Sequence, residues 1–108
     1  MSKAAAVTTA TWEAEVENSE VPVLVDFWAT WCQPCLRLGP TLDQVAEDFE
    51  GKAKVFKVDI DQEQDLAVKY NVMQIPNLVF FKGGKQVDQV MGVVPKSVIA
   101  DKLEKLVS

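Results

Sequence analysis

The fold of this chain is decided by the stretch Val21–Cys35, which reads VPVLVDFWATWCQPC. Its first part, up to Trp28, is apolar at nearly every position, which is typical of a β-strand that is covered on both faces. Its last part holds the only two cysteines of the chain, Cys32 and Cys35, where the first turn of a helix is expected. The stretch therefore predicts a buried strand that leads two thiols to a helix N-terminus.

Two cysteines separated by two residues can form a structural disulfide, bind half of a metal site, or exchange electrons. As a structural link, the pair closes so small a loop that it stabilises the fold by only about 2 kcal/mol. A metal site needs two more ligands, and the chain has no histidine and no third cysteine. A zinc ion shared between two molecules is then the one metal alternative, and we predict a site without metal.

The position of the cysteines favours electron exchange. A helix N-terminus favours negative charge, because its first backbone N–H groups have no partner and the helix dipole places its positive end there. A thiolate carries such a charge, and it is the nucleophile of thiol–disulfide exchange. The pair therefore indicates a redox site.

Composition and charge narrow the class of protein. The length of 108 residues fits a single domain, residues 1–108. With 16 acidic against 11 basic residues, the formal net charge is −5, which argues against nucleic acid or an anionic membrane as the main partner. No apolar stretch is long enough to span a membrane, and the apolar part of the N-terminus is too short for a signal peptide. We therefore expect a cytoplasmic protein.

Apolar spacing and turn residues predict the remaining elements. The expected elements are a helix at 9–18, the strand at 21–28, a helix from the cysteines to Gly51, a strand at 54–59, a short helix through Leu66 and Tyr70, strands at 78–81 and 86–91 joined by Gly83-Gly84, and a helix from Pro95 onward, with a further short strand at 4–7. This order predicts an α/β fold, in which four helices flank both faces of a mixed sheet of four to five strands.

Three local signals refine these expectations. Asp61 and Gln64 have the spacing of a capping box for the short helix. Asn71 follows that helix, where a residue tolerant of the left-handed conformation is common. Pro40 lies inside the helix after the cysteines and should kink it.

Several separated motifs resemble the thioredoxin family in order and spacing. They are Val25-Asp26-Phe27-Trp28-Ala29, Trp31-Cys32-x-Pro34-Cys35, Pro40, Asp59-x-Asp61, Ile75-Pro76, Phe81-x-x-Gly84 and Gly92. The resemblance extends from Val7 to Leu106 and implies a thioredoxin fold. It also implies a monomeric protein-disulfide reductase that needs no cofactor beyond its own redox-active disulfide, Cys32–Cys35. Its partners would be thioredoxin reductase, as electron donor, and disulfide-containing target proteins.

The resemblance also implies roles for single residues. Cys32 would be the attacking thiolate, exposed at the helix N-terminus, and Cys35 the more buried resolving thiol. Asp26, buried beneath the cysteines, would transfer protons, with Lys57 as its neighbour. A cis-proline loop and the cysteine turn would bind the substrate, through Trp31, Gln33, Pro34, Ile75, Pro76 and Gly92.

Physical arguments weigh these roles against simpler ones. A carboxylate inside an apolar strand is costly to bury in its charged form, so the pKa of Asp26 should rise; alternatively, Asp26 forms a structural hydrogen bond at a strand end. Pro76 could instead form an ordinary trans turn, since cis bonds are uncommon even before proline. Gly92 could be only a strand-end turn, although a missing side chain also lets a partner backbone approach.

The sequence departs from the common pattern of the family near the site. Gln33 replaces the usual glycine between the cysteines, Asn77 replaces a common threonine, and Met73-Gln74 replace a usually basic or small pair. The absence of a histidine between the cysteines favours a reductant over an oxidant. Two alternatives to a general reductase stay open: a specialised protein with a narrow partner set, and a binding subunit whose cysteines are dispensable.

Overall fold

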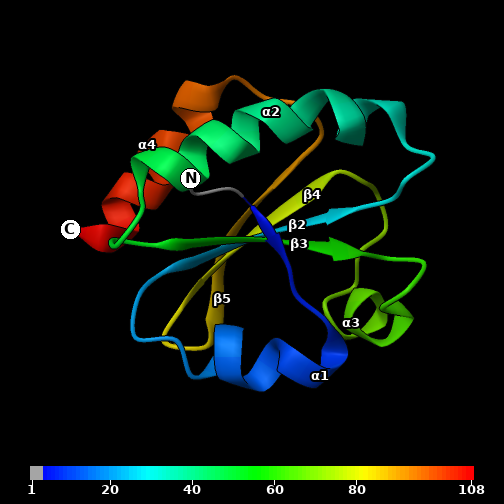
Figure 1. Cartoon of the computed structure of the whole chain (residues 1–108), viewed down its shortest axis with the longest axis horizontal. Coiled ribbons are helices and arrows are strands. Elements are labelled where there is room, and N and C mark those ends of the chain that lie inside the picture. The colour runs from blue at the N-terminus through cyan, green and yellow to red at the C-terminus, as the bar shows by residue number, and fades with distance from the viewer. Residues whose placement is uncertain (1–3) are drawn as a thin grey trace.

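The computed structural model describes residues 4–108, which form a five-stranded sheet with helices on both faces (Figure 1). The strand order is β1-β3-β2-β4-β5; β1, β3 and β2 are parallel, whereas β4 is antiparallel to both β2 and β5. The elements are β1 (Ala5–Ala6), α1 (Thr9–Trp12), the π-helix η1 (Glu13–Glu17), β2 (Val23–Trp28), α2 (Gln33–Asp48), β3 (Lys54–Asp59), α3 (Gln64–Lys69), β4 (Asn77–Lys82), β5 (Lys85–Met91) and α4 (Lys96–Val107). The predicted fold class is confirmed, with five strands.

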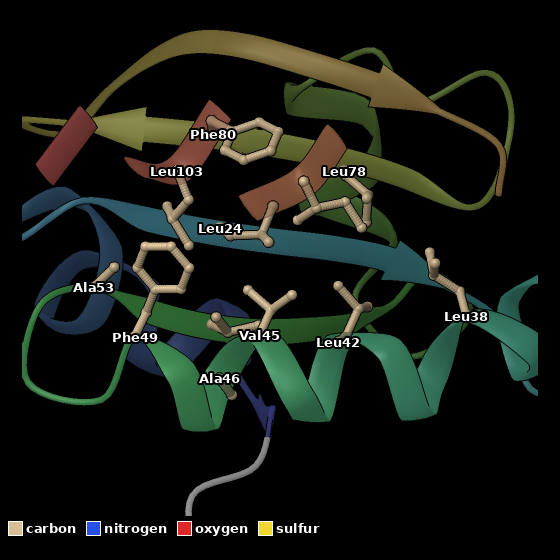
Figure 2. Packing of buried hydrophobic residues seen from close by; sticks show 12 residues of the cluster. Leu24, Leu38, Leu42, Val45, Ala46, Phe49, Ala53, Leu78, Phe80 and Leu103 are labelled. Atoms are coloured by element: carbon tan, nitrogen blue, oxygen red, sulfur yellow. The ribbon is translucent and has the colours of Figure 1, made fainter. Parts of the chain in front are cut away.

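Strand β2 lies at the centre of the sheet, and its side chains alternate between two apolar clusters. Leu24 points into the cluster beneath α2 and α4, whereas Val25 and Phe27 point into the cluster beneath α1 and α3. Figure 2 shows the first cluster, in which Leu42 and Val45 of α2 face the sheet. Because both faces are covered, β2 has no polar face, and its continuous apolar run is explained.

Helix α2 begins directly after the cysteine turn, with Cys32 as its N-cap residue. Pro40 lies within the helix as predicted, and the kink expected there stays a prediction. None of the helices in residues 4–108 has both the length and the apolar character that a membrane crossing requires.

The first helix begins where the sequence predicted but changes its winding. Thr8 caps α1 and shares a capping box with Thr11. From Glu13 the helix widens into η1, whose end is marked by a 2.9 Å hydrogen bond from the Asn18 N–H to the Glu13 carbonyl, five residues back. No sequence signal predicted this widening.

The predicted capping box of α3 is wrong. Glu63 is the N-cap residue, and no side chain caps the helix. The Asp61 carboxylate instead accepts a hydrogen bond from the Trp31 indole N–H at 2.8 Å, while the Gln64 side-chain amide donates to the Asp61 carbonyl. A partner distant in sequence therefore engages the side chain that was expected to cap the helix. The left-handed conformation of Asn71 is confirmed, with φ of 54°.

Candidate redox site

Cys32 and Cys35 form a disulfide at the start of α2, with their Cα atoms 5.3 Å apart. Strand β2 ends at Trp28, and a short turn then carries the chain into the helix. The backbone N–H of Cys35 donates a hydrogen bond to Cys32 Sγ at 3.2 Å. A free N–H of the first helical turn therefore points at the sulfur, and the same donor would stabilise a Cys32 thiolate.

Both cysteines are buried, which corrects one expectation. Cys32 is only 6% exposed, although it was expected to be exposed; Cys35 is deeper, at 3%. The two side chains form a small apolar cluster with Ala29, against which Trp28, Ile60 and Ile75 pack. Neighbours from β2 and two loops thus cover most of the disulfide, and sequence spacing alone could not indicate them.

Asp26 lies fully buried in the middle of β2. Neither of its carboxylate oxygens has a hydrogen-bond partner within residues 4–108, so no described residue supports the alternative of a structural hydrogen bond. Burial raises the pKa of Asp26 from 3.8 to about 7, while the charge of Lys57 lowers it and only partly offsets burial. At neutral pH this carboxyl can therefore both bind and release a proton.

Lys57 lies beside Asp26, because the two residues are paired across the parallel strands β2 and β3. The ammonium nitrogen of Lys57 lies 4.1 Å from the centre of the Trp28 ring. The predicted neighbourhood of Asp26 and Lys57 is therefore confirmed. The proton-transfer role that the resemblance implies for them stays a prediction.

The loop before β4 contains a cis peptide bond between Ile75 and Pro76, as predicted. The backbone N–H of Gly92 donates a 2.8 Å hydrogen bond to the Pro76 carbonyl, so the loop and the end of β5 are joined. Gly92 has φ of 88°, and the space beside its Cα is open. Its lack of a side chain therefore leaves room at the surface as well as permitting the turn.

The remaining predicted contact residues lie in and before the first turn of α2. Trp31 is 64% exposed, and its hydrogen bond to Asp61 fixes the indole ring. Gln33 is exposed and Pro34 half-buried. Ile75 is half-buried and packs against the cysteine cluster, so the structure brings the loop before β4 to the redox pair.

Sequence reasoning missed a hollow on α3 and the loop after it. The hollow has a volume of about 210 Å³ and is lined by Ala67, Val68, Asn71, Val72 and Met73. Val68 and Met73 are 79% and 81% exposed. Two signals could have indicated this surface: Val68 lies outside the apolar stripe of its short helix, and Met73 departs from the common pattern of the family. No group of three or more potential metal ligands comes together in the described part of the chain.

Comparisons with known proteins agree with this geometry. The family model described as thioredoxin matches residues 3–105. The chain is 50% identical to thioredoxin 1 of Nostoc sp., covering 97% of this chain and 98% of that protein. It is 46% identical to a thioredoxin of Synechocystis sp., over 97% and 98% of the two chains.

A solved structure is similar as well. A mutant thioredoxin from Halobacterium salinarum superposes with a TM-score of 0.86 at 32% identity, covering 97% of this chain and 90% of that one. The likeness therefore extends over the sheet, its covering helices and the cysteine turn together.

Proposed function

Since this chain belongs to the thioredoxin family and is a thiol–disulfide oxidoreductase that reduces protein disulfides, we propose that Cys32 attacks the target and Cys35 resolves the complex. The observation that carries this assignment is the 3.2 Å hydrogen bond from the Cys35 N–H to Cys32 Sγ. That donor lowers the cost of a thiolate on Cys32 and on no other sulfur. The greater burial of Cys35 supports its role as the second thiol to react.

In the proposed reaction, the thiols of Cys32 and Cys35 supply the two electrons that reduce the target disulfide. The Cys32 thiolate attacks one sulfur of the target disulfide, and the other target sulfur leaves as a thiolate that takes up a proton. Cys35 then loses its proton and attacks Cys32 Sγ, which breaks the mixed disulfide. The target leaves as a dithiol, reduced by two electrons, and Cys32–Cys35 is oxidised.

Asp26 would serve as the proton carrier of this cycle. Its carboxyl is buried with no hydrogen-bond partner among the described residues, and its pKa is about 7. A general base works best when its pKa is near the working pH. Lys57 would adjust that pKa by stabilising the carboxylate form.

Target proteins would dock on the surface around the cysteine turn. Support comes from the exposed Trp31 ring, the open space at Gly92, and the loop of Ile75 and Pro76 that packs beside the cysteines. Gln33 and Pro34, in the first turn of α2, would lie beside the Cys32 sulfur and the target disulfide that it attacks.

The net charge of the chain and the names of its relatives support a proposal for its partners and its location in the cell. Thioredoxin reductase would supply electrons, and the targets would be disulfide-containing proteins rather than nucleic acid or membranes, given the net charge of −5. We propose a monomer in the cytoplasm. One relative has a name that places it in the chloroplast: the chain is 42% identical to thioredoxin M-type, chloroplastic, from Spinacia oleracea, over 94% of this chain and 56% of that protein.

The deciding experiment is insulin reduction coupled to a generic thioredoxin reductase. The wild-type protein should reduce insulin with turnover, and a variant with both cysteines replaced by serine should have no activity. Wild-type activity with dithiothreitol but none with the reductase would favour the specialised alternative, which the exposed Met73 supports. If the double serine variant restores a deletion strain, the chain acts as a binding subunit.

A further inference from the structure

Trp28 contacts both the redox pair and the residue beside the buried carboxyl. It is two residues beyond Asp26 on β2, so the two side chains lie on the same face of the sheet. The Trp28 ring packs against the cluster of Ala29, Cys32 and Cys35. The same ring lies 4.1 Å from the ammonium nitrogen of Lys57. One aromatic side chain thus joins the two parts of the site.

The Lys57 ammonium group has few contacts that restrain its position. Its flexible stem allows the ammonium group to move into water, and it forms no ion pair with any acidic group of residues 4–108. A cation within about 6 Å of a tryptophan ring centre is attracted by the ring, more strongly where water is partly excluded. The ring is therefore an attractive contact for this ammonium group on the Asp26 side of the sheet.

We propose that Trp28 is a positioning residue, whose ring holds the Lys57 ammonium group where its charge acts on the Asp26 carboxyl. Trp28 therefore influences Asp26 through Lys57 and not by packing alone. The consequence for catalysis rests on the proposed proton-carrier role of Asp26, whereas the positioning itself does not.

The other described charged groups on this face have hydrogen-bond or ion-pair partners of their own. Asp59 follows on the same face of β3, but one of its carboxylate oxygens accepts a 2.9 Å hydrogen bond from the Asp61 N–H in the following turn. The cysteine thiols titrate only in the reduced protein. Asp43 of α2 accepts a hydrogen bond from the Ala4 N–H at 3.2 Å, and Asp88 of β5 forms an ion pair with Lys102 of α4. Ala6 of β1, Leu78 of β4, and Leu38 and Leu42 of α2 contribute apolar side chains.

The test measures the pKa of Asp26 by carboxyl NMR titration of the oxidised full chain. Trp28→Leu should raise this pKa by about half a unit, because the carboxylate loses a nearby positive charge, and Trp28→Phe should raise it less. In a Lys57→Gln background, Trp28→Leu should cause no further rise. An equal shift in both backgrounds would overturn the proposal, since Trp28 would then act through packing.

Two further measurements complete the test. Trp31→Leu is the matched control, because Trp31 contacts Asp61 and not Lys57, and it should leave the pKa of Asp26 unchanged. In the wild-type protein, the Lys57 side-chain protons should be shifted upfield by the ring current of Trp28; ordinary shifts would overturn the proposal even if a variant fails to fold.

The pH profile of insulin reduction separates this inference from the proposed function. If the profile of Trp28→Leu moves with the pKa of Asp26, both are supported. If the pKa moves and the profile does not, the positioning of Lys57 is supported, and the proton-carrier role of Asp26 is wrong.

Discussion

Asp26 is the residue at which burial has the clearest thermodynamic consequence. The unfolded chain releases the Asp26 proton near pH 3.8, whereas the folded protein keeps it up to about pH 7. Folding therefore takes up a proton between these values, and stability falls as pH rises through this window. Below pH 4 the penalty is absent, and above pH 7 it is complete, at about 4 kcal/mol.

Replacing Asp26 by alanine should therefore stabilise the protein and slow its catalysis. At pH 8 we expect the free energy of unfolding to rise by up to about 4 kcal/mol, because the variant no longer buries a charged carboxylate. At pH 4 we expect little gain, because the buried carboxyl of the wild-type protein is already protonated. Urea melts at both pH values and insulin-reduction rates measure the two effects. Asp101→Ala, at an exposed acid of α4, should change neither; a variant at Asp26 that is less stable at pH 8, or equally fast, contradicts the proposed role.

The two cysteines should differ when each is replaced by serine. Cys35→Ser should accumulate mixed disulfides with target proteins, because Cys32 still attacks but no second thiol resolves the complex. Cys32→Ser should accumulate few, since Cys35 is 3% exposed and its sulfur accepts no hydrogen bond from an N–H of residues 4–108. Non-reducing gels of cell extract compare the variants, and more captured protein with Cys32→Ser would reverse the two assignments.

At the scale of elements, the β4–β5 hairpin depends on its close packing against η1. Gly83 and Gly84 both have positive φ, at 62° and 80°. A Cβ added to Gly84 would lie 2.6 Å from the Glu17 carbonyl oxygen, whereas one added to Gly83 would meet nothing within 4 Å. The two glycines thus share the backbone requirement of the turn, and only Gly84 also requires the absence of a side chain.

Alanine at these two positions should separate the two requirements. Gly83→Ala should cost about 1–2 kcal/mol of stability, from the left-handed conformation alone. Gly84→Ala should cost about 2–5 kcal/mol, because the hairpin or η1 must also move. Chemical denaturation measures the stability of both variants. Equal losses of stability would show that the hairpin or η1 shifts away from the clash with Glu17 at no cost in free energy.

At the scale of the whole molecule, the two apolar clusters share one sheet. Leu42 of α2 belongs to one cluster and Leu66 of α3 to the other. Strand β2 contributes side chains to both, so loss of either cluster exposes the same strand. We therefore propose that residues 1–108 unfold as a single domain.

Leucine-to-alanine changes on opposite faces test this cooperativity. Leu42→Ala and Leu66→Ala should each lower the free energy of unfolding by about 2–5 kcal/mol, with far-UV circular dichroism and tryptophan fluorescence reporting the same transition. Val68→Ala, in the same helix as Leu66 but 79% exposed, should change stability by less than about 0.5 kcal/mol. Two separate transitions in either leucine variant would contradict the single domain.

The sequence determined the fold class and the chemistry of this protein, because both depend on local patterns. The continuous apolar run of β2 requires a covered central strand, and Cys32 follows it at the N-terminus of the next helix, where a thiolate is stabilised. A carboxyl within that run must be buried, so the direction of the Asp26 pKa shift could also be predicted.

The tertiary structure alone decided which distant side chains meet. Trp31 engages Asp61, which removes the expected cap of α3. The ammonium group of Lys57 packs on the Trp28 ring. Ile75 packs against the cysteine cluster, and Cys32 is therefore more buried than a position at a helix N-terminus suggests. These contacts depend on strand order, register and loop packing, which place residues side by side regardless of their separation in sequence.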